Sequence, residues 1–187
     1  TRTLTRAVTH AVEKAMPWPE WQDAAWLKKQ AWPAWLTALK RLNADGTLDT
    51  TFNPGGAGLA ATGGQPEVNA LYVDAQDRIY VGGTFTSYNG TARSCLLRLN
   101  PDGTLDTTFN NTGLGGSNRY VKSIAEQADG KILVAGAFTT INGTSRFNVA
   151  RLNADGSVDA TFSANAVAFS VANVFDCVGV QADGKIL

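Results

Sequence analysis

The residues best suited to chemistry lie in a motif that occurs three times. The pattern Arg-Leu-Asn-x-Asp-Gly-x-x-Asp runs over residues 41–49, 98–106 and 151–159, at spacings of 57 and 53 residues. Its carboxylate and amide oxygens are of the kind that bind calcium. If the glycine takes the sixth position of a twelve-residue calcium loop, however, the first and last positions fall on Arg and Phe in every copy. The spacing therefore argues against an EF-hand.

A tight turn explains the same residues. The glycine of Asp-Gly accepts a positive φ, and the second aspartate can accept hydrogen bonds from nearby backbone amides. Weak or partner-completed calcium binding is the alternative. Asn-Gly dipeptides are also turn signals, although residues 89–91, 110–112 and 142–144 fit the N-glycosylation sequon as well. The predicted structural turn residues are Asp45, Gly46, Asp49, Asn89, Gly90, Asp102, Gly103, Asp106, Asp129, Gly130, Asn142, Gly143, Asp155, Gly156 and Asp159.

One arginine begins each copy of the motif. Arg41, Arg98 and Arg151 would form a ring of positive charge if the repeats were arranged radially. An arginine beside repeated aspartates can also form ion pairs between repeats, and we favour this structural role.

Outside the motif the sequence offers little catalytic chemistry. The single histidine is His10, and the chain has neither a Gly-x-Ser-x-Gly motif nor a phosphate-binding loop. Cys95 and Cys177 align with Asn148 and Ser123 of the second repeat, so no repeated disulfide or metal framework exists. Because an active site needs one asymmetric cluster, acidic residues that recur once per repeat indicate a scaffold. We expect no catalytic residue, no cofactor and no metal site.

Charge and hydropathy limit the partners. The 16 basic and 16 acidic residues cancel, which removes the electrostatic argument for binding nucleic acid or an anionic membrane. No apolar run approaches the roughly 20 residues of a membrane-spanning helix. The chain begins with Thr1 and stops inside a strand pattern at Leu187, so we interpret it as a fragment.

The composition changes near Lys40. Residues 1–40 follow helical spacing, and all five tryptophans lie between Trp18 and Trp35. These tryptophans are expected to form a core or a docking surface, with stacking on a sugar or a partner groove as the alternative. From Arg41 onward, alternating β-branched and aromatic residues and glycine-containing turns predict strands.

The repeat, with a period of 53–57 residues, divides the strand region into the end of a unit (41–67), two full units (68–120 and 121–173) and a truncated unit (174–187). One face of the second strand should carry Ile79, Val81 and Phe85. A single unit buries too little apolar surface to offset the entropy of ordering it, so the units must stack. The predicted strands are 70–73, 78–85, 95–99 and 104–109 in the first full unit, 122–125, 131–138, 148–152 and 157–162 in the second, and 175–180 in the third.

These motifs make residues 41–187 similar to the bacterial delta-60 repeat family. The matching segments are Gln127 to Thr139, Asn142-Gly143 and Ala150 to Phe162, whereas the first unit lacks the Asp-Gly dipeptide at residues 75–78. The resemblance implies a β-propeller-like domain in large, often secreted or surface-attached bacterial proteins with no established activity.

We therefore expect a mainly β fold: a partial β-propeller-like array of small antiparallel sheets, about 2.5 units long, after a short helical segment. Its expected role is that of a non-catalytic extracellular or cell-surface scaffold that binds an unknown protein or carbohydrate. The remaining blades of a longer chain are also expected as partners. The variable segments 53–67, 110–120 and 163–173 either contact that ligand or merely tolerate insertions. The alternatives are a propeller enzyme whose catalytic residues lie in missing blades and a calcium-stabilised adhesin. With fewer than three units, exposed sheet edges and apolar faces should also make the chain associate or stay partly molten in solution.

Overall fold

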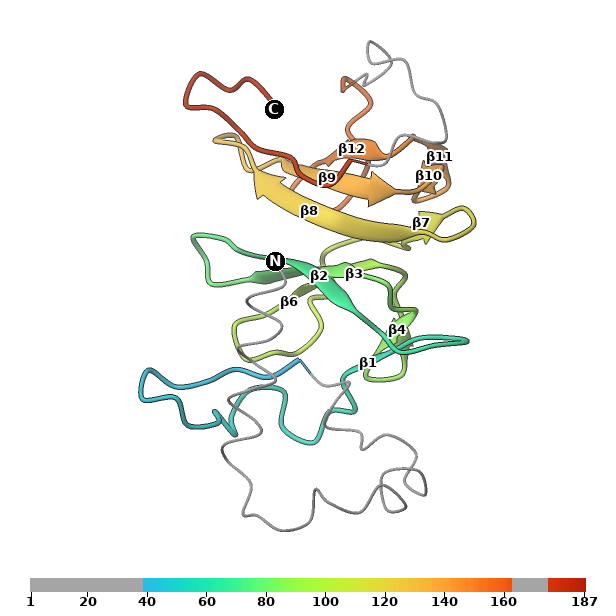
Figure 1. Cartoon of the computed structure of the whole chain (residues 1–187). Coiled ribbons are helices and arrows are strands. Elements are labelled where there is room, and N and C mark those ends of the chain that lie inside the picture. Colours follow the sequence, from blue (N-terminus) through green and yellow to red (C-terminus); the bar gives the residue numbers. More distant parts are fainter. Residues whose placement is uncertain (1–38, 163–174) are drawn as a thin grey trace.

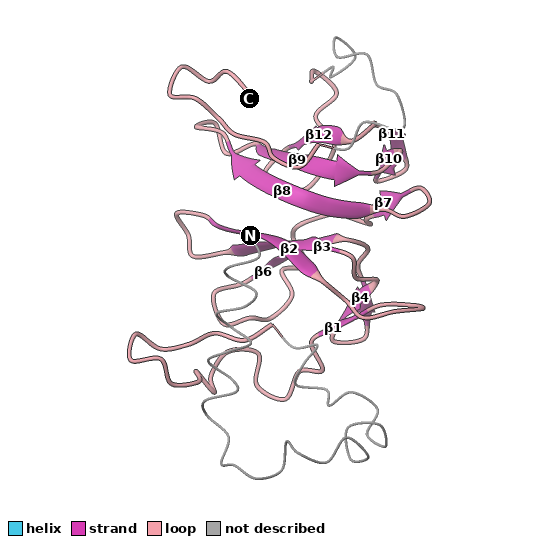
Figure 2. Cartoon of the chain, in the orientation of Figure 1, coloured by secondary structure: helices cyan, strands magenta, loops and turns pink. Residues whose placement is uncertain are grey.

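The computed structural model describes residues 39–162 and 175–187, so the predicted helical segment and its tryptophans lie outside the described residues, as does segment 163–173. Within the described residues the chain forms strands and turns and no helix (Figure 2). The twelve strands of this described part build four antiparallel sheets of three strands each. The expected mainly β, propeller-like array of small sheets is confirmed, and the sheets do not close on themselves.

Two larger sheets form the framework of the stack. In each, the second strand is central and pairs with the first and the third (Figure 1). The central position of this strand explains its continuous apolar character, because both of its faces are covered. The strands are β2 (Val68–Val73), β3 (Ile79–Gly83) and β6 (Leu96–Leu99) in one sheet, and β8 (Tyr120–Glu126), β9 (Ile132–Ala137) and β12 (Val149–Leu152) in the other.

Two smaller sheets, which the sequence did not predict, flank the larger ones on one side of the stack (Figure 1). Each contains a two-residue hairpin closed by an Asn-Gly turn and a third short strand from the segment before the unit. Strands of two residues are too short to show an alternating pattern. They are β1 (Leu59–Ala60), β4 (Ser87–Tyr88) and β5 (Thr91–Ala92), and β7 (Leu114–Gly115), β10 (Thr140–Ile141) and β11 (Thr144–Ser145).

Three kinds of predicted strand were wrong. Segments 104–109 and 157–162 form only isolated bridges, because a second turn at Asp106 or Asp159 follows the hairpin at once. Segment 175–180 likewise contributes one bridge, from Val180 to Ile186. The predicted strand 78–85 ends at Gly83, where the chain leaves the large sheet for the small one.

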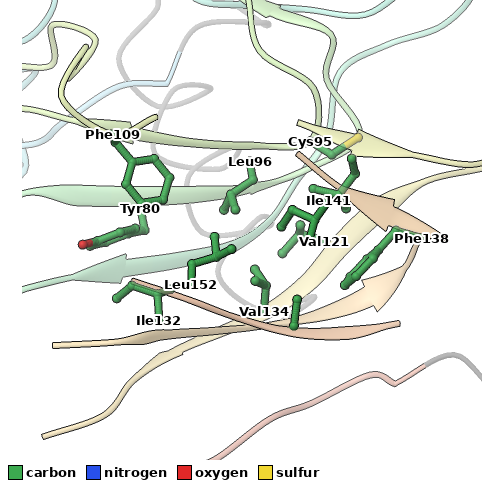
Figure 3. Packing of buried hydrophobic residues seen from close by; sticks show 12 residues of the cluster. Tyr80, Cys95, Leu96, Phe109, Val121, Ile132, Val134, Phe138, Ile141 and Leu152 are labelled. Atoms are coloured by element: carbon green, nitrogen blue, oxygen red, sulfur yellow. The ribbon is translucent and has the colours of Figure 1, made fainter. Parts of the chain in front are cut away.

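The apolar core forms three layers that alternate with the sheets. The largest cluster lies between the two larger sheets, where Tyr80 and Phe109 face Ile132, Val134 and Leu152 (Figure 3). A second cluster covers the opposite face of β3, and a third joins β9 to residues 175–186. Stacking of the repeats is therefore what buries their apolar side chains.

The predicted division of faces along the second strand is confirmed. Ile79, Val81 and Phe85 pack in one cluster, whereas Tyr80 points into the cluster on the opposite face. The equivalent residues of the next repeat also share a single cluster. Alternation along the strand thus assigns its side chains to two different layers, not to core and solvent.

Gly82 lies where the two larger sheets approach each other closely. A Cβ atom at this position would lie 2.5 Å from Cγ1 of Val121 on β8. Real carbon atoms do not approach so closely, so a side chain at residue 82 must push the next repeat away.

We predict that Gly82→Ala destabilises the fold by about 1–3 kcal/mol through overpacking. Urea unfolding followed by circular dichroism gives the magnitude. Gly64→Ala is the matched control, because a Cβ atom there meets nothing within 4 Å. Adding Val121→Ala to Gly82→Ala should recover part of the loss. Strictly additive effects of the two substitutions would contradict the predicted contact between the sheets.

Candidate functional site: the junctions between repeats

Arg98, on β6, is a buried cation that connects two repeats. Its side chain is 2% exposed. Nε donates to Oδ2 of Asp106 at 2.7 Å, and Nη1 donates to the hydroxyl of Tyr80 at 3.1 Å. Nη1 also donates, at 2.6 Å, to the carbonyl of Ala154, which lies 56 residues further along the chain in the Asp-Gly turn of the next repeat. The guanidinium stacks over Phe109 at 4.7 Å from the ring centre.

The ion pair lies within a repeat, which corrects the expectation of pairs between repeats. A hairpin returns the chain, so the amide of Asp106 donates to the carbonyl of Arg98 at 2.9 Å and the two side chains meet. What crosses the boundary is the hydrogen bond from the guanidinium to a backbone carbonyl. We call residues 41–52, 98–109 and 151–162 the junction hairpins. Each arginine is neutralised in its own hairpin, so a ring of unpaired positive charge does not form.

The other two junction hairpins show the same pairing at higher exposure. Arg41 contacts Asp49 at 2.7 Å, donates to the carbonyl of Pro101 in the following repeat and is 40% exposed. Arg151 contacts Asp159 at 2.8 Å and is 18% exposed, and Lys131 approaches the same carboxylate at 3.1 Å. The arginine of the motif is therefore buried to a different degree in each of the three hairpins.

The Asp-Gly turns act as acceptors for the preceding repeat. The amide of Asn53 donates to the carbonyl of Asp102 at 2.7 Å, and the amide of Asn110 donates to that of Asp155 at 2.6 Å. The next carbonyl along each turn is also bound, because Gly103 accepts from the hydroxyl of Tyr88 at 2.7 Å and Gly156 accepts from the side-chain Nδ2 of Asn142 at 2.9 Å. Each turn thus holds two neighbouring segments of chain by its backbone.

The turn residues adopt the conformations that their positions need. Gly46, Gly103 and Gly156 have φ near 84°, 83° and 86°. The carboxylate before each glycine accepts bonds from the amide and hydroxyl of the residue two places later, as Asp102 does from Thr104 at 2.9 and 2.7 Å. The second aspartate does the same, since Oδ1 of Asp106 accepts from the amide and hydroxyl of Thr108.

The turn that lacks Asp-Gly in the first unit keeps its geometry. Asp77 replaces Gly130 and has φ of 58°, compared with 77° for the glycine. The amide of Asp77 donates to the carbonyl of Asp74 at 3.0 Å, and that of Gly130 donates to Gln127 at 2.9 Å. Aspartate tolerates this left-handed conformation better than most residues. The departure in sequence therefore leaves the turn intact.

The Asn-Gly residues form the hairpins of the small sheets. Asn89 and Gly90 have φ of 47° and 78°, and both signs are those of a type I′ turn. The side chain of Asn89 also bonds within the fold, since Oδ1 accepts from the amide of Gly58 at 2.7 Å and Nδ2 donates to Asn53 at 2.7 Å. Asn142 and Gly143 repeat the turn with φ of 50° and 73°. Their amide groups therefore have structural partners in the folded chain.

The two cysteines have unrelated settings. Both are free thiols, Cys95 buried and Cys177 exposed. Cys95 has φ of 65° and the equivalent Asn148 has φ of 61°, so both sit at the same left-handed bend before the third strand. Burial raises the pKa of the Cys95 thiol, which lowers its reactivity.

The described residues do not gather the side chains that usually hold a metal ion. In ranges 39–162 and 175–187, no three His, Cys, Asp or Glu side chains gather where they could hold a metal. Over the same ranges, no helix has the length and apolar character needed to cross a membrane. Polar groups do cluster in the junction hairpins.

Sequence reasoning identified the arginine and the aspartates of the junction hairpins but missed their partners. Thr108 and Phe109 complete the pocket around Arg98, and the motif extends in every copy to Asp-x-Thr-Phe. That recurring Thr-Phe was a usable signal. The backbone carbonyls that bind the arginine carry no side-chain signal, and their position could only come from the stacking of the repeats.

We predict that Asp106→Asn costs about 3 kcal/mol of unfolding free energy, because it leaves a charged arginine buried without its counter-ion. Asp49→Asn makes the same chemical change beside a more exposed arginine and should cost less. Chemical unfolding of both variants measures the difference. Equal losses would show that burial of the arginine does not govern the contribution of the pair.

The junction hairpins should also make the fold acid-sensitive. Hydrogen bonds from Thr51 and Arg41 lower the pKa of Asp49 to about 2. Burial pushes the pKa of Asp106 upward, but bonds from Thr108 and Arg98 outweigh it and leave that pKa below the usual value.

A carboxyl whose pKa is lower in the folded state stabilises the fold above about pH 4 and loses that contribution as the pH falls through the folded-state pKa. The urea concentration at the unfolding midpoint should therefore decrease as the pH is lowered from about 4 to about 2. In the Asp106→Asn variant this urea midpoint should decrease less steeply with falling pH than in the unsubstituted chain. A midpoint that stays constant down to pH 2 would disprove this linkage.

Comparison with known proteins agrees with the fold. A family model described as the DUF5122 beta-propeller, a domain of unknown function, matches residues 36–52, 77–109 and 127–162. These matched segments contain the junction hairpins and the central strands. No curated protein and no solved structure is significantly similar to the chain. The family match supports a chain built from repeats of the propeller type.

Proposed function

We propose that the chain is a non-catalytic binding module in which a rigid stack of propeller-type repeats presents variable loops to a protein or carbohydrate ligand. The observation that carries this proposal is the separation of two sides. Segments 53–67 and 110–120, which differ between repeats, contribute strands to the small sheets, on the side opposite the turns that join β2 to β3 and β8 to β9 (Figure 1). Segment 163–173 lies outside the described residues.

The loops on this side are exposed but anchored at their bases. Residues 62–65 are all exposed, and the amide of Glu67 donates to Oγ1 of Thr84 at 3.0 Å. In the next repeat, Nε of Arg119 donates to Oγ of Ser94 at 2.8 Å. Exposed loops on a rigid scaffold are the usual location of binding residues. The tip at residues 62–65 is therefore the first candidate for ligand contact.

The junction hairpins are less suited to binding, because their polar groups serve the contacts within and between repeats. The carboxylates of Asp45, Asp102 and Asp155 each accept bonds from the second residue that follows. The arginines are paired in their own hairpins. Groups already satisfied inside the fold have little remaining capacity to recognise a ligand or to catalyse a reaction.

A location outside the cell or on its surface belongs to the same proposal. It is supported by the resemblance to delta-60 repeats, whose proteins are often secreted or surface-attached. Brief treatment of intact producing cells with a protease that cannot enter them tests it. Loss of the full-length protein from intact cells is expected, whereas complete protection until the cells are lysed would refute the location.

Binding to arrays of immobilised glycans and surface proteins tests the function. We expect at least one ligand to be retained, and Thr62→Ala combined with Gln65→Ala to weaken its binding at least tenfold. Gln76→Ala, an exposed change in the turn between β2 and β3 on the opposite side, is the matched control and should leave binding unchanged. Binding that survives the loop variant, or conversion of a ligand into product, would overturn the proposal.

A further inference from the structure

We propose that Asn89 is a site of spontaneous modification, at which the side-chain amide is lost and the residue becomes aspartate or isoaspartate, whereas the fold protects the equivalent Asn142. Both residues begin the sequence Asn-Gly-Thr and lie in the type I′ turn of a small sheet. Their local chemistry is therefore alike. What differs is the set of hydrogen bonds that the folded chain makes with each side chain.

The reaction needs only the chain and water. The backbone nitrogen of the following glycine attacks Cγ of the asparagine, and a five-membered succinimide ring closes. The side-chain nitrogen leaves as ammonia and carries away the proton of the glycine amide. Water then opens the ring at either of its two carbonyls, which gives aspartate or isoaspartate. Glycine favours the ring closure, because it has no Cβ atom to hinder the attack.

The side chain of Asn142 is held by bonds that oppose this reaction. Its Nδ2 donates to the carbonyl of Gly156 at 2.9 Å and to that of Asn110 at 3.4 Å. Its Oδ1 accepts from the amide of Thr112 at 2.9 Å, and the residue is partly buried. Cγ has to rotate towards the nitrogen of Gly143 before the ring can close, and this rotation breaks the bonds together. Each bond that must be broken slows the reaction.

The side chain of Asn89 is held less firmly, and the residue is exposed. Its Nδ2 donates to Oδ1 of Asn53 at 2.7 Å, and its Oδ1 accepts from the amide of Gly58 at 2.7 Å. The acceptor of its amide group is thus another side chain, which can rotate, and not a backbone carbonyl fixed in a turn. Freeing Asn89 costs less than freeing Asn142, so Asn89 should react first.

The aspartate product should also have a different effect at each position. At residue 89 a carboxylate keeps the oxygen that accepts from Gly58. Nδ2 of Asn53 already donates to Oδ1 of Asn89 at 3.4 Å, and rotation of that amide brings the same donor to the new oxygen. At residue 142 the carboxylate would face the carbonyls of Gly156 and Asn110, which are acceptors as well. The bonds that join the small sheet to the junction hairpin would then be lost.

Peptide mapping by mass spectrometry tests the difference in rate. The chain is incubated at mildly alkaline pH, and aspartate and isoaspartate are quantified at both positions over time. In the folded chain Asn89 should convert about fivefold faster than Asn142 or more, since one net hydrogen bond supplies about that factor. The control is the same chain unfolded in urea, where the two rates should be nearly equal. Equal rates in the folded chain, an Asn89 that reacts only in urea, or a difference that persists in urea would overturn the proposal.

Variants that carry the product residue test the effect on stability. Asn89→Asp should leave the urea midpoint of unfolding nearly unchanged, whereas Asn142→Asp should lower it. The two substitutions make the same chemical change in the same kind of turn, so each is the matched control of the other. An equal or greater loss in the Asn89→Asp variant would contradict the assignment of Asn89 as the tolerant site.

Discussion

The structure depends on the burial of a guanidinium group between repeats. A charge removed from water must find a counter-ion and hydrogen-bond acceptors, or the cost of its desolvation unfolds the site. Arg98 meets this demand with a carboxylate from its own hairpin and a carbonyl from the next repeat. Because the carbonyl has to be in place, a repeat is complete only when its successor is stacked on it.

This requirement explains why the repeats are long yet contain small sheets. The junction hairpin adds no full strand to the sheet of its repeat. Its arginine, aspartate and phenylalanine instead form a rigid unit whose outer groups are directed towards a neighbour. Apolar stacking supplies the non-directional attraction between layers, and the hydrogen bonds of the hairpins fix how one layer is placed on the next.

The sequence predicted the larger features of the fold because they repeat. Period and alternation correctly indicated stacked β units, and the alternation of Ile79 and Val81 with Tyr80 separated the two faces of β3. The short strands of the small sheets could not be predicted, because two residues carry no periodic signal. Asp77 shows a different limit, since the expected dipeptide is absent although the turn is present.

The candidate site was predicted only in part. The recurrence of the arginine and the aspartate indicated that they form an ion pair. That the pair lies within one hairpin, and not between repeats, follows from the return of the chain at Asp106. The partner carbonyls at Pro101 and Ala154 belong to residues that differ between the repeats. A backbone acceptor is supplied by any residue, so it leaves no trace in the sequence.

The unequal spacing of the motif, 57 and then 53 residues, has a consequence for how such chains change. The extra length lies between Phe52 and Val68, outside the junction hairpin and before the strand that follows it. Stacking is set by groups on either side of this segment, so its length is not coupled to the spacing of the layers. Insertions there can alter the outer surface of one repeat while the neighbouring repeats keep their mutual geometry.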